Sequence, residues 1–307
     1  MRYTSYAFQV PEEKIVRVVT NTDAKNEADD QFAIVHALLS PKFENVGFIA
    51  AHYGIARHQD SMQRSYRELE TIFEKMDFPS EGLLFHGCER PLASKTEILH
   101  SEGASLIIEE AMKDDPRPLY VLFLGPLTDL ASAYLQEPRI ANRLTAIWIG
   151  GGAYPSGSIE FNLSNDIHAT NVVFSSPIPL WQVPKNVYEM IPVSFAELEQ
   201  KVYPHGKIGK YLLEQLNEHA HEPGPRTSAF RSGETWVLGD SPAVGLVLYE
   251  HRYEFDWVPA PLIGMDMQYI HTGLNRPIRV YRRIDPRLIL EDFYSKLALF
   301  AATVAHT

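Results

Sequence analysis

Four acidic side chains stand within eight positions of the sequence, between an apolar strand-like run and a helix-like run. They are Asp23, Glu27, Asp29 and Asp30. Capping of a helix N-terminus explains one or two such acids, each gaining about 0.3–1 kcal/mol from the helix dipole. Four crowded carboxylates repel one another unless a cation lies among them, and oxygen ligands of this kind suit Ca²⁺ or Mg²⁺. The segment therefore predicts a divalent cation site, with helix capping as the alternative.

Three further segments bring polar groups or turns to strand ends or helix starts. Gly125-Pro126 makes a tight turn after an apolar run, and the triple glycine at 150–152 precedes Glu160-Phe161-Asn162. Asp240 stands before Pro242, which begins another apolar helix. Each segment has a plain structural interpretation, as a turn, a loop or an N-cap. Their chemical meaning depends on whether the fold brings them together.

The elements that must position these groups alternate between strands and helices in the first two thirds of the chain. We expect strands at 15–20, 46–51, 83–85, 119–124, 146–149 and 178–182. We expect helices at 28–39, 59–76, 101–113, 127–135 and 167–174. This alternation predicts a parallel sheet with right-handed crossovers, which binds ligands at the carboxyl ends of its strands.

The last third of the sequence changes character and becomes mainly helical. We expect helices at 195–203, 208–219, 242–250 and 288–302, and a strand at 278–281. This part either completes the sheet or forms a helical cap. Because no clean linker divides the chain, we expect residues 1–307 to form a single α/β domain.

Composition excludes several classes of protein. The 307 residues carry 39 acidic and 28 basic side chains, a formal net charge of −11, so we expect no nucleic-acid partner. The single cysteine, Cys88, excludes an internal disulfide or a cysteine-rich zinc site. No export signal is recognisable, and the apolar runs are too short to span a bilayer. These features predict a cytoplasmic protein with no membrane association.

The ordered motifs resemble those of the nucleoside hydrolase family, the inosine-uridine preferring N-ribohydrolases. The family motif DTDPGxDD corresponds to Asn21-Thr22-Asp23 and Asp29-Asp30, with two extra residues between the two parts. The GPLTN motif corresponds to Gly125-Pro126-Leu127-Thr128-Asp129. The EFN motif stands as Glu160-Phe161-Asn162, followed by Asn165-Asp166. The resemblance spans most of the chain in the family's order.

The resemblance implies an open, doubly wound, mostly parallel Rossmann-like sheet with additional C-terminal helices. It also implies one catalytic Ca²⁺ per chain, assembly as a homodimer or homotetramer, and hydrolysis of the N-glycosidic bond of a nucleoside to ribose and free base. By position, the calcium ligands are Asp23, Asp30, Asp240 and the backbone carbonyl of Leu124. Asp23 corresponds to the base that activates water, and Asp29, Glu160 and Asn162 correspond to ribose-binding residues.

The sequence departs from the family at two positions that concern the substrate. Gly239 replaces the histidine that protonates the departing base in many members, and Ile55 replaces a ribose-binding asparagine. His52 is a candidate substitute for that asparagine. Candidates for activating the leaving group are His168, Arg231, Glu234 and Trp236, the last by stacking on the base.

Two other functions stay open at this point. A divergent protein could keep the metal and bind a nucleoside without turnover, since Gly239 and Ile55 remove expected groups. An acidic motif after a first strand also occurs in haloacid dehalogenase-like phosphohydrolases, although Asn21 and the absence of a leading DxD disfavour that reading. The sequence does not name the base.

Overall fold

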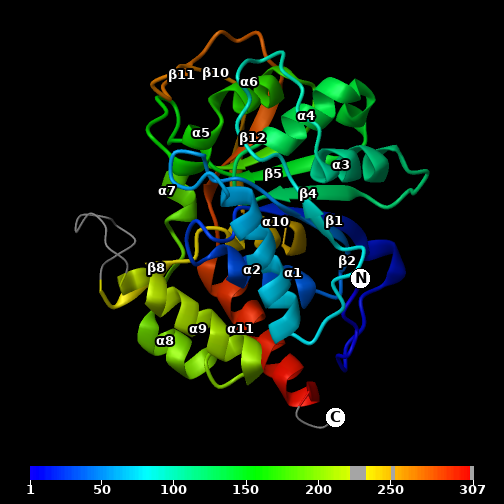
Figure 1. The fold of residues 1–307 in the computed structure, drawn as a ribbon, viewed down its shortest axis with the longest axis vertical. Coiled ribbons are helices and arrows are strands. Elements are labelled where there is room, and N and C mark those ends of the chain that lie inside the picture. Colours follow the sequence, from blue (N-terminus) through cyan, green and yellow to red (C-terminus); the bar gives the residue numbers. More distant parts are fainter. Residues whose placement is uncertain (222–232, 250–252, 305–307) are drawn as a thin grey trace.

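An eight-stranded sheet forms the centre of the computed structural model, which describes residues 1–221, 233–249 and 253–304 (Figure 1). Its strands are, in spatial order, β3 (Leu84–His86), β2 (Phe43–Ala50), β1 (Val16–Thr22), β4 (Leu119–Phe123), β5 (Thr145–Ile149), β6 (Leu180–Val183), β12 (Pro277–Arg283) and β9 (Glu254–Pro259). All neighbouring pairs are parallel except β12 and β9. The predicted α/β class with a mostly parallel sheet is thus confirmed.

Helices cover both faces of the sheet, each over its own hydrophobic cluster (Figure 1). One face carries α1 (Asp30–Leu38), α2 (Ser61–Lys75), α8 (Phe195–Lys201), α9 (Gly206–His221), α10 (Ser241–Leu248) and α11 (Pro286–Val304). The other carries α3 (Glu102–Met112), α4 (Thr128–Gln136) and α6 (Ile167–Ser175). Because both faces of the sheet are covered, every residue of β1 is buried, the polar Arg17 and Asn21 included.

Short elements connect these layers. They are η1 (Glu12–Lys14), η2 (Pro138–Asn142), α5 (Phe161–Asn165), α7 (Lys185–Tyr188), the paired strands β7 (Pro192–Ser194) and β8 (Thr235–Val237), and the paired strands β10 (Leu262–Ile263) and β11 (Tyr269–Ile270). The last third of the chain therefore both completes the sheet and forms a helical cover, the two possibilities that the sequence left open. It extends the sheet with β12 and β9, and its helices cover one face.

The order of the strands decides where a ligand can bind. From β1 the chain winds outward through β2 and β3, then returns to place β4 on the other side of β1. The loops after β1 and β4 therefore lead to opposite faces of the sheet and leave a crevice between them. Buried Asp129 fixes this region, because its carboxylate accepts hydrogen bonds from Asn21 Nδ2, the Cys88 amide and Ser101 Oγ.

No helix among the described residues combines the length and the apolar character needed to cross a membrane.

Candidate functional site

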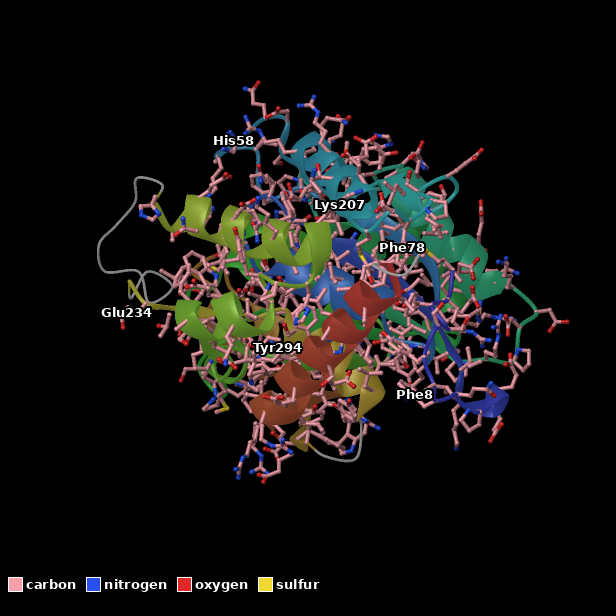
Figure 2. The ribbon with its side chains drawn as sticks, turned by 90° about the horizontal axis from the view of Figure 1, so that it is seen from below. Phe8, His58, Phe78, Lys207, Glu234 and Tyr294 are labelled. Atoms are coloured by element: carbon pink, nitrogen blue, oxygen red, sulfur yellow. The ribbon has the colours of Figure 1, made fainter. Side chains whose placement is uncertain are left out.

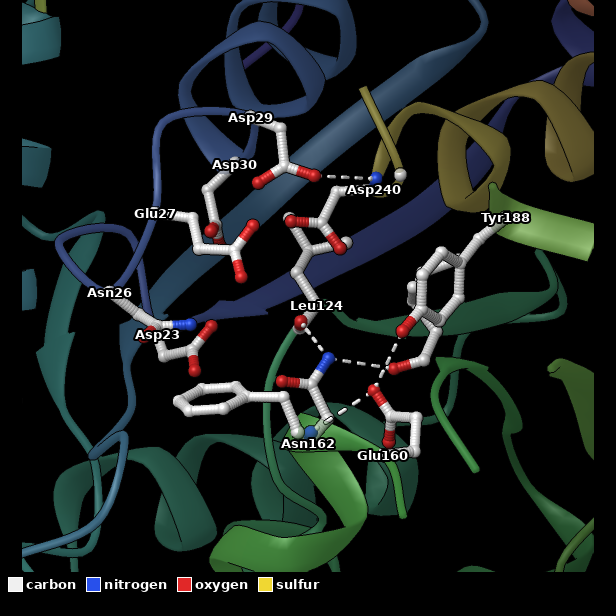
Figure 3. Close-up of a pocket in the computed structure, with 13 residues that line it drawn as sticks. Asp23, Asn26, Glu27, Asp29, Asp30, Leu124, Glu160, Asn162, Tyr188 and Asp240 are labelled. Carbon is white, nitrogen blue, oxygen red and sulfur yellow. Dashed lines mark hydrogen bonds between the residues drawn. The ribbon is translucent and has the colours of Figure 1, made fainter. Parts of the chain in front are cut away.

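A cavity opens at the carboxyl ends of β1, β4 and β5, where the strand order reverses (Figure 3). Its lining comprises Asp23, Asn26, Glu27, Asp29, Asp30, Leu124, Ile149, Glu160, Phe161, Asn162, Tyr188, Gly239 and Asp240. These residues come from the loop after β1, the ends of β4 and β5, the start of α5, the end of α7 and the start of α10. Residues from or beside all four segments that the sequence left separate thus meet at one place.

Three buried carboxylates form the tightest acidic group of this cavity. One oxygen each of Asp29, Asp30 and Asp240 lies within 4.8 Å of the other two. Ca²⁺ binds oxygen ligands at about 2.3–2.6 Å, so two oxygens on one ion lie at most about 5 Å apart. The spacing of this all-oxygen group therefore fits a hard divalent cation.

Helix capping does not account for these acids. Asp29 and Asp240 occupy the N-cap positions of α1 and α10, yet neither side chain accepts a capping hydrogen bond from its helix. By contrast, the carboxylate of Asp166 caps α6 by accepting from the Ala169 amide. Neither Asp29 nor Asp240 therefore makes a capping hydrogen bond to its own helix, and Asp29 Oδ2 instead accepts from the Asp240 amide at 3.3 Å.

Asp23 and Leu124 line the same cavity (Figure 3). The Asp23 Oδ2 atom is buried and has no hydrogen-bond partner among the described residues. Gly125 allows the Asp23 side chain to approach, because a Cβ atom at Gly125 would lie 2.8 Å from Asp23 Cγ. The backbone carbonyl of Leu124 accepts a hydrogen bond of 2.7 Å from Asn162 Nδ2. Asp23 therefore keeps a carboxylate oxygen available for a ligand.

Burial raises the pKa of every acid in the group, and neighbouring carboxylates raise it further for Asp23, Glu27, Asp30 and Asp240. Burial, followed by the charge of Asp29, raises the pKa of Asp30 to about 7 and that of Glu27 to about 8. Burial raises the pKa of Asp29 to about 6. The pKa values of Asp23 and Asp240 also lie well above the usual range, again chiefly because of burial. Near neutral pH the cavity must hold protons or a cation.

Glu160 and Asn162 lie opposite the aspartates and serve mainly the local fold. The Glu160 carboxylate accepts from the amides of Gly151 and Leu163 on Oε2, and from the Asn162 amide and the Tyr188 hydroxyl on Oε1. Asn162 Nδ2 donates to the carbonyls of Leu124 and Ile149. Among the described contacts, only Oδ1 of the Asn162 amide is left free.

Sequence reasoning did not single out several lining residues. Asn26 and Glu27 belong to the lengthened loop after β1, and Glu27 was counted there only for the density of acids. Arg57 donates from Nη1 to Asn26 Oδ1 at 2.5 Å and stacks 4.3 Å from the ring centroid of Phe161. Tyr188 has no motif around it, and only the fold shows that it faces the cavity.

The structure does not bring His52 to this cavity. His52 is fully buried at the end of β2, where its Nδ1 accepts from the Gly54 amide and its Nε2 lies 2.8 Å from Thr128 Oγ1. Thr128 in turn donates to Asp166 Oδ2. Burial lowers the pKa of His52 to about 4, so the ring is neutral at physiological pH. Both ring nitrogens are thus occupied, Nδ1 by the loop after β2 and Nε2 by Thr128 at the start of α4.

The candidates for the leaving-group acid do not line the acidic cavity either. Trp236 is buried in β8 and lines a separate cavity of about 540 Å³ next to α9. Glu234 is exposed at the rim of the molecule (Figure 2), and His168 lies on α6 away from the lining. Arg231 lies outside the described residues. Gly239 does line the cavity, where a Cβ atom would lie 3.1 Å from Tyr188 Cδ2.

The hydrogen bonds of Glu160 predict a structural role that can be measured. Glu160→Gln places an amide NH₂ group against hydrogen-bond donors and should lower the free energy of unfolding by about 2 kcal/mol. Tyr188→Phe removes one of these donors and should lower the free energy of unfolding by about 1 kcal/mol. Urea denaturation checks both values. Glu70→Gln, at an exposed position of α2, is the matched control and should change nothing. A Glu160→Gln protein as stable as this control would contradict the role.

The raised pKa values predict how stability depends on pH. Without a divalent cation, the folded protein binds more protons than the unfolded chain between the unfolded pKa values near 4 and the folded values of about 6 to 8. Stability should therefore fall as the pH rises from about 4 to about 8 in chelator. Added Ca²⁺ should raise the melting temperature more at the higher pH. Equal increments at both pH values would contradict this electrostatic account.

Comparisons with known proteins find similarity to nucleoside hydrolases. A family profile described as inosine-uridine preferring nucleoside hydrolase matches residues 18–280. The pyrimidine-specific ribonucleoside hydrolase RihA of Salmonella typhimurium is 26% identical over 197 residues, which is 56% of this chain and 61% of that protein. The match thus spans less than two thirds of that relative's length.

Solved structures share the fold at lower sequence identity. A purine-preferring ribonucleoside hydrolase from Gardnerella vaginalis superimposes with a TM-score of 0.78 at 18% identity, covering 94% of this chain and 99% of that one. The plant nucleoside hydrolase PpNRh1 gives a TM-score of 0.72, also at 18% identity, over 92% and 99% of the two chains. Because the family profile covers most of its length, this chain belongs to the inosine-uridine preferring nucleoside hydrolase family.

Proposed function

We propose that this protein hydrolyses the N-glycosidic bond of a ribonucleoside, with one bound Ca²⁺, to give ribose and the free base. The observation that carries the proposal is the group of buried carboxylates of Asp29, Asp30 and Asp240 at the point where the strand order reverses. Neither Asp29 nor Asp240 uses its side chain to cap its helix. Family membership supplies the reaction class. The names of the relatives, one pyrimidine-specific and one purine-preferring, do not select a base.

The donor set fits calcium. Asp30, Asp240 and Asp23 would provide carboxylate oxygens, and the Leu124 carbonyl, which also accepts from Asn162, has a second lone pair. Asp29, Asp30 and Asp240 form the closest group of carboxylate oxygens, and Asp23 lines the same cavity outside that group. A bound Ca²⁺ would orient the ribose diol and make a bound water more acidic. All donors are oxygen, as a hard cation requires.

Each residue of the site would have its own role in the reaction. Asp23, whose Oδ2 has no partner among the described residues, would take the proton from water as the water attacks the anomeric carbon. Cleavage passes through a ribose with oxocarbenium-like positive charge, which the neighbouring carboxylates stabilise. Asn162 Oδ1 can accept a hydrogen bond from a ribose hydroxyl. Hydrolysis by direct water attack leaves no covalent intermediate on the enzyme.

A second candidate function is nucleoside binding without turnover. The specific observation that favours it is the absence of a side chain at Gly239, together with the placement of His168, Trp236 and Glu234 outside the cavity lining. Such a protein would keep the cation and the ribose contacts but would not activate the leaving base. An assay of ribose release distinguishes the two functions.

Ribose release from inosine, uridine and p-nitrophenyl riboside tests the proposal. We expect release that stops in chelator and returns with Ca²⁺, and a loss of about 100-fold or more in Asp30→Ala and Asp23→Asn. Asp114→Ala removes an exposed acid before β4 and should retain activity. The nitrophenyl group needs no protonation, so cleavage of that substrate alone would indicate a ribose site that lacks leaving-group activation.

Two outcomes would overturn the proposal. Undiminished hydrolysis in chelator would remove the role of the cation. Tight nucleoside binding by calorimetry with no hydrolysis of any of the three substrates would instead establish the binding protein.

We further propose that the 307 residues act as one α/β domain in the cytoplasm, assembled as a homodimer or homotetramer. A single buried cysteine, Cys88, supports a reducing compartment. Three exposed apolar side chains near the paired strands β10 and β11 support assembly: Ile159 is 72% exposed, Met265 74% and Ile270 52%. Clustered apolar exposure of this kind marks protein contacts.

Light scattering during gel filtration checks the assembly. We expect a mass two or four times the 34.8 kDa of one chain. Met265→Asp should shift the mass toward the monomer, because a charge is costly in an apolar interface. Ile98→Asp, at an exposed site on another segment, is the control. A monomeric wild type would contradict the assembly without affecting the proposed reaction.

A further inference from the structure

Glu160 has little capacity left for a substrate. A carboxylate offers about four lone-pair sites, and all four are filled by the amides of Gly151, Asn162 and Leu163 and by the hydroxyl of Tyr188. Accepting a hydrogen bond from a ribose hydroxyl would require one of these contacts to break inside a buried site. Glu160 therefore forms the wall of the cavity and shapes the turn before α5.

Glu27 lies in the same cavity but, unlike Glu160, has hydrogen-bonding capacity left for a substrate. It lines the cavity, and its carboxylate makes no hydrogen bond or ion pair with the described residues. Figure 3 shows its carboxylate turned inward, between Asp30 and the carbonyl of Leu124. The side chain is only partly buried and its oxygens are open to the cavity, so a ligand bound there can complete its contacts.

The loop that carries Glu27 is held in place by its neighbours. Asn26 accepts from Arg57, whose guanidinium stacks on Phe161 at the start of α5. On the other side, Gln215 of α9 donates from Nε2 to the Ala28 carbonyl at 2.8 Å. Glu27 thus lies between two anchored residues, so its position in the cavity is set by the fold rather than by chance.

We propose that Glu27 is a substrate-binding residue that accepts a hydrogen bond from a ribose hydroxyl, the contact that the saturated carboxylate of Glu160 does not offer. The lengthened loop after β1 supplies this acceptor from the side opposite Glu160. The inference rests on the proposed function and specifies how the same cavity recognises its sugar. It makes Glu27 a determinant of sugar specificity within this chain.

The experiment compares wild type and Glu27→Gln on a ribonucleoside that the wild type hydrolyses and on its 2′-, 3′- and 5′-deoxy analogues. The ratio of the two kcat/KM values for each substrate isolates the contact between Glu27 and one hydroxyl. Hydrogen bonds to charged groups contribute about 1.5–3 kcal/mol, so we expect a loss of about 10- to 100-fold on the parent, chiefly in KM. That loss should vanish for the one analogue that lacks the bonded hydroxyl.

Controls separate this inference from the proposed function. Glu70→Gln should match wild type on every substrate. The Ca²⁺ concentration that supports half-maximal activity should be the same for Glu27→Gln and wild type. An equal loss on all four substrates, or a weakened Ca²⁺ requirement, would overturn the hydroxyl contact. Wild type that hydrolyses no ribonucleoside would overturn the proposed function itself.

Discussion

The structure depends on one electrostatic constraint, the burial of several carboxylates at the point where the sheet reverses its strand order. Asp29, Asp30 and Asp240 place oxygens within 4.8 Å of one another, and Asp23 lies beside them. Like charges at such distances raise one another's pKa, so the fold is fully satisfied only with protons or a cation bound. The strand order, the approach allowed by Gly125 and the start of α10 all bring these groups together.

The hydrogen-bond pattern distinguishes the acids that build the cavity from those left for a ligand. Glu160 and Asp166 each accept several hydrogen bonds from backbone amides and hydroxyls, and they fix turns and helix starts. Asp23 and Glu27 have carboxylate oxygens without partners among the described residues. Glu160 therefore matches a ribose-binding position of the family and yet stabilises the fold. Glu27 matches no motif position of the family and has carboxylate oxygens available for a ligand.

Much of the fold could be predicted because the relevant signals are local. The six strands of the parallel core and the helices between them follow from apolar runs separated by helical periodicity. The antiparallel edge strand β9 was missed, since it is mostly exposed and its sequence lacks the apolar run that marked the others. The acids after β1 were singled out because they follow a strand, but the sequence assigned Asp23 to the cation and Asp29 to the ribose, whereas the structure groups Asp29 with Asp30 and Asp240. His52, Trp236 and Tyr188 could not be placed, because only packing between distant segments decides which side chain reaches the cavity.

The central claim is that the carboxylate group holds one divalent cation, and direct calorimetric titration of chelator-treated protein with Ca²⁺ tests it most directly. The account predicts one ion per chain, with binding that weakens as the pH falls because protons compete for the same oxygens. Asp240→Asn should abolish this binding, and Asp114→Asn, at an exposed site, should leave it intact. Absence of binding in the wild type, or binding that survives Asp240→Asn unchanged, would contradict the account.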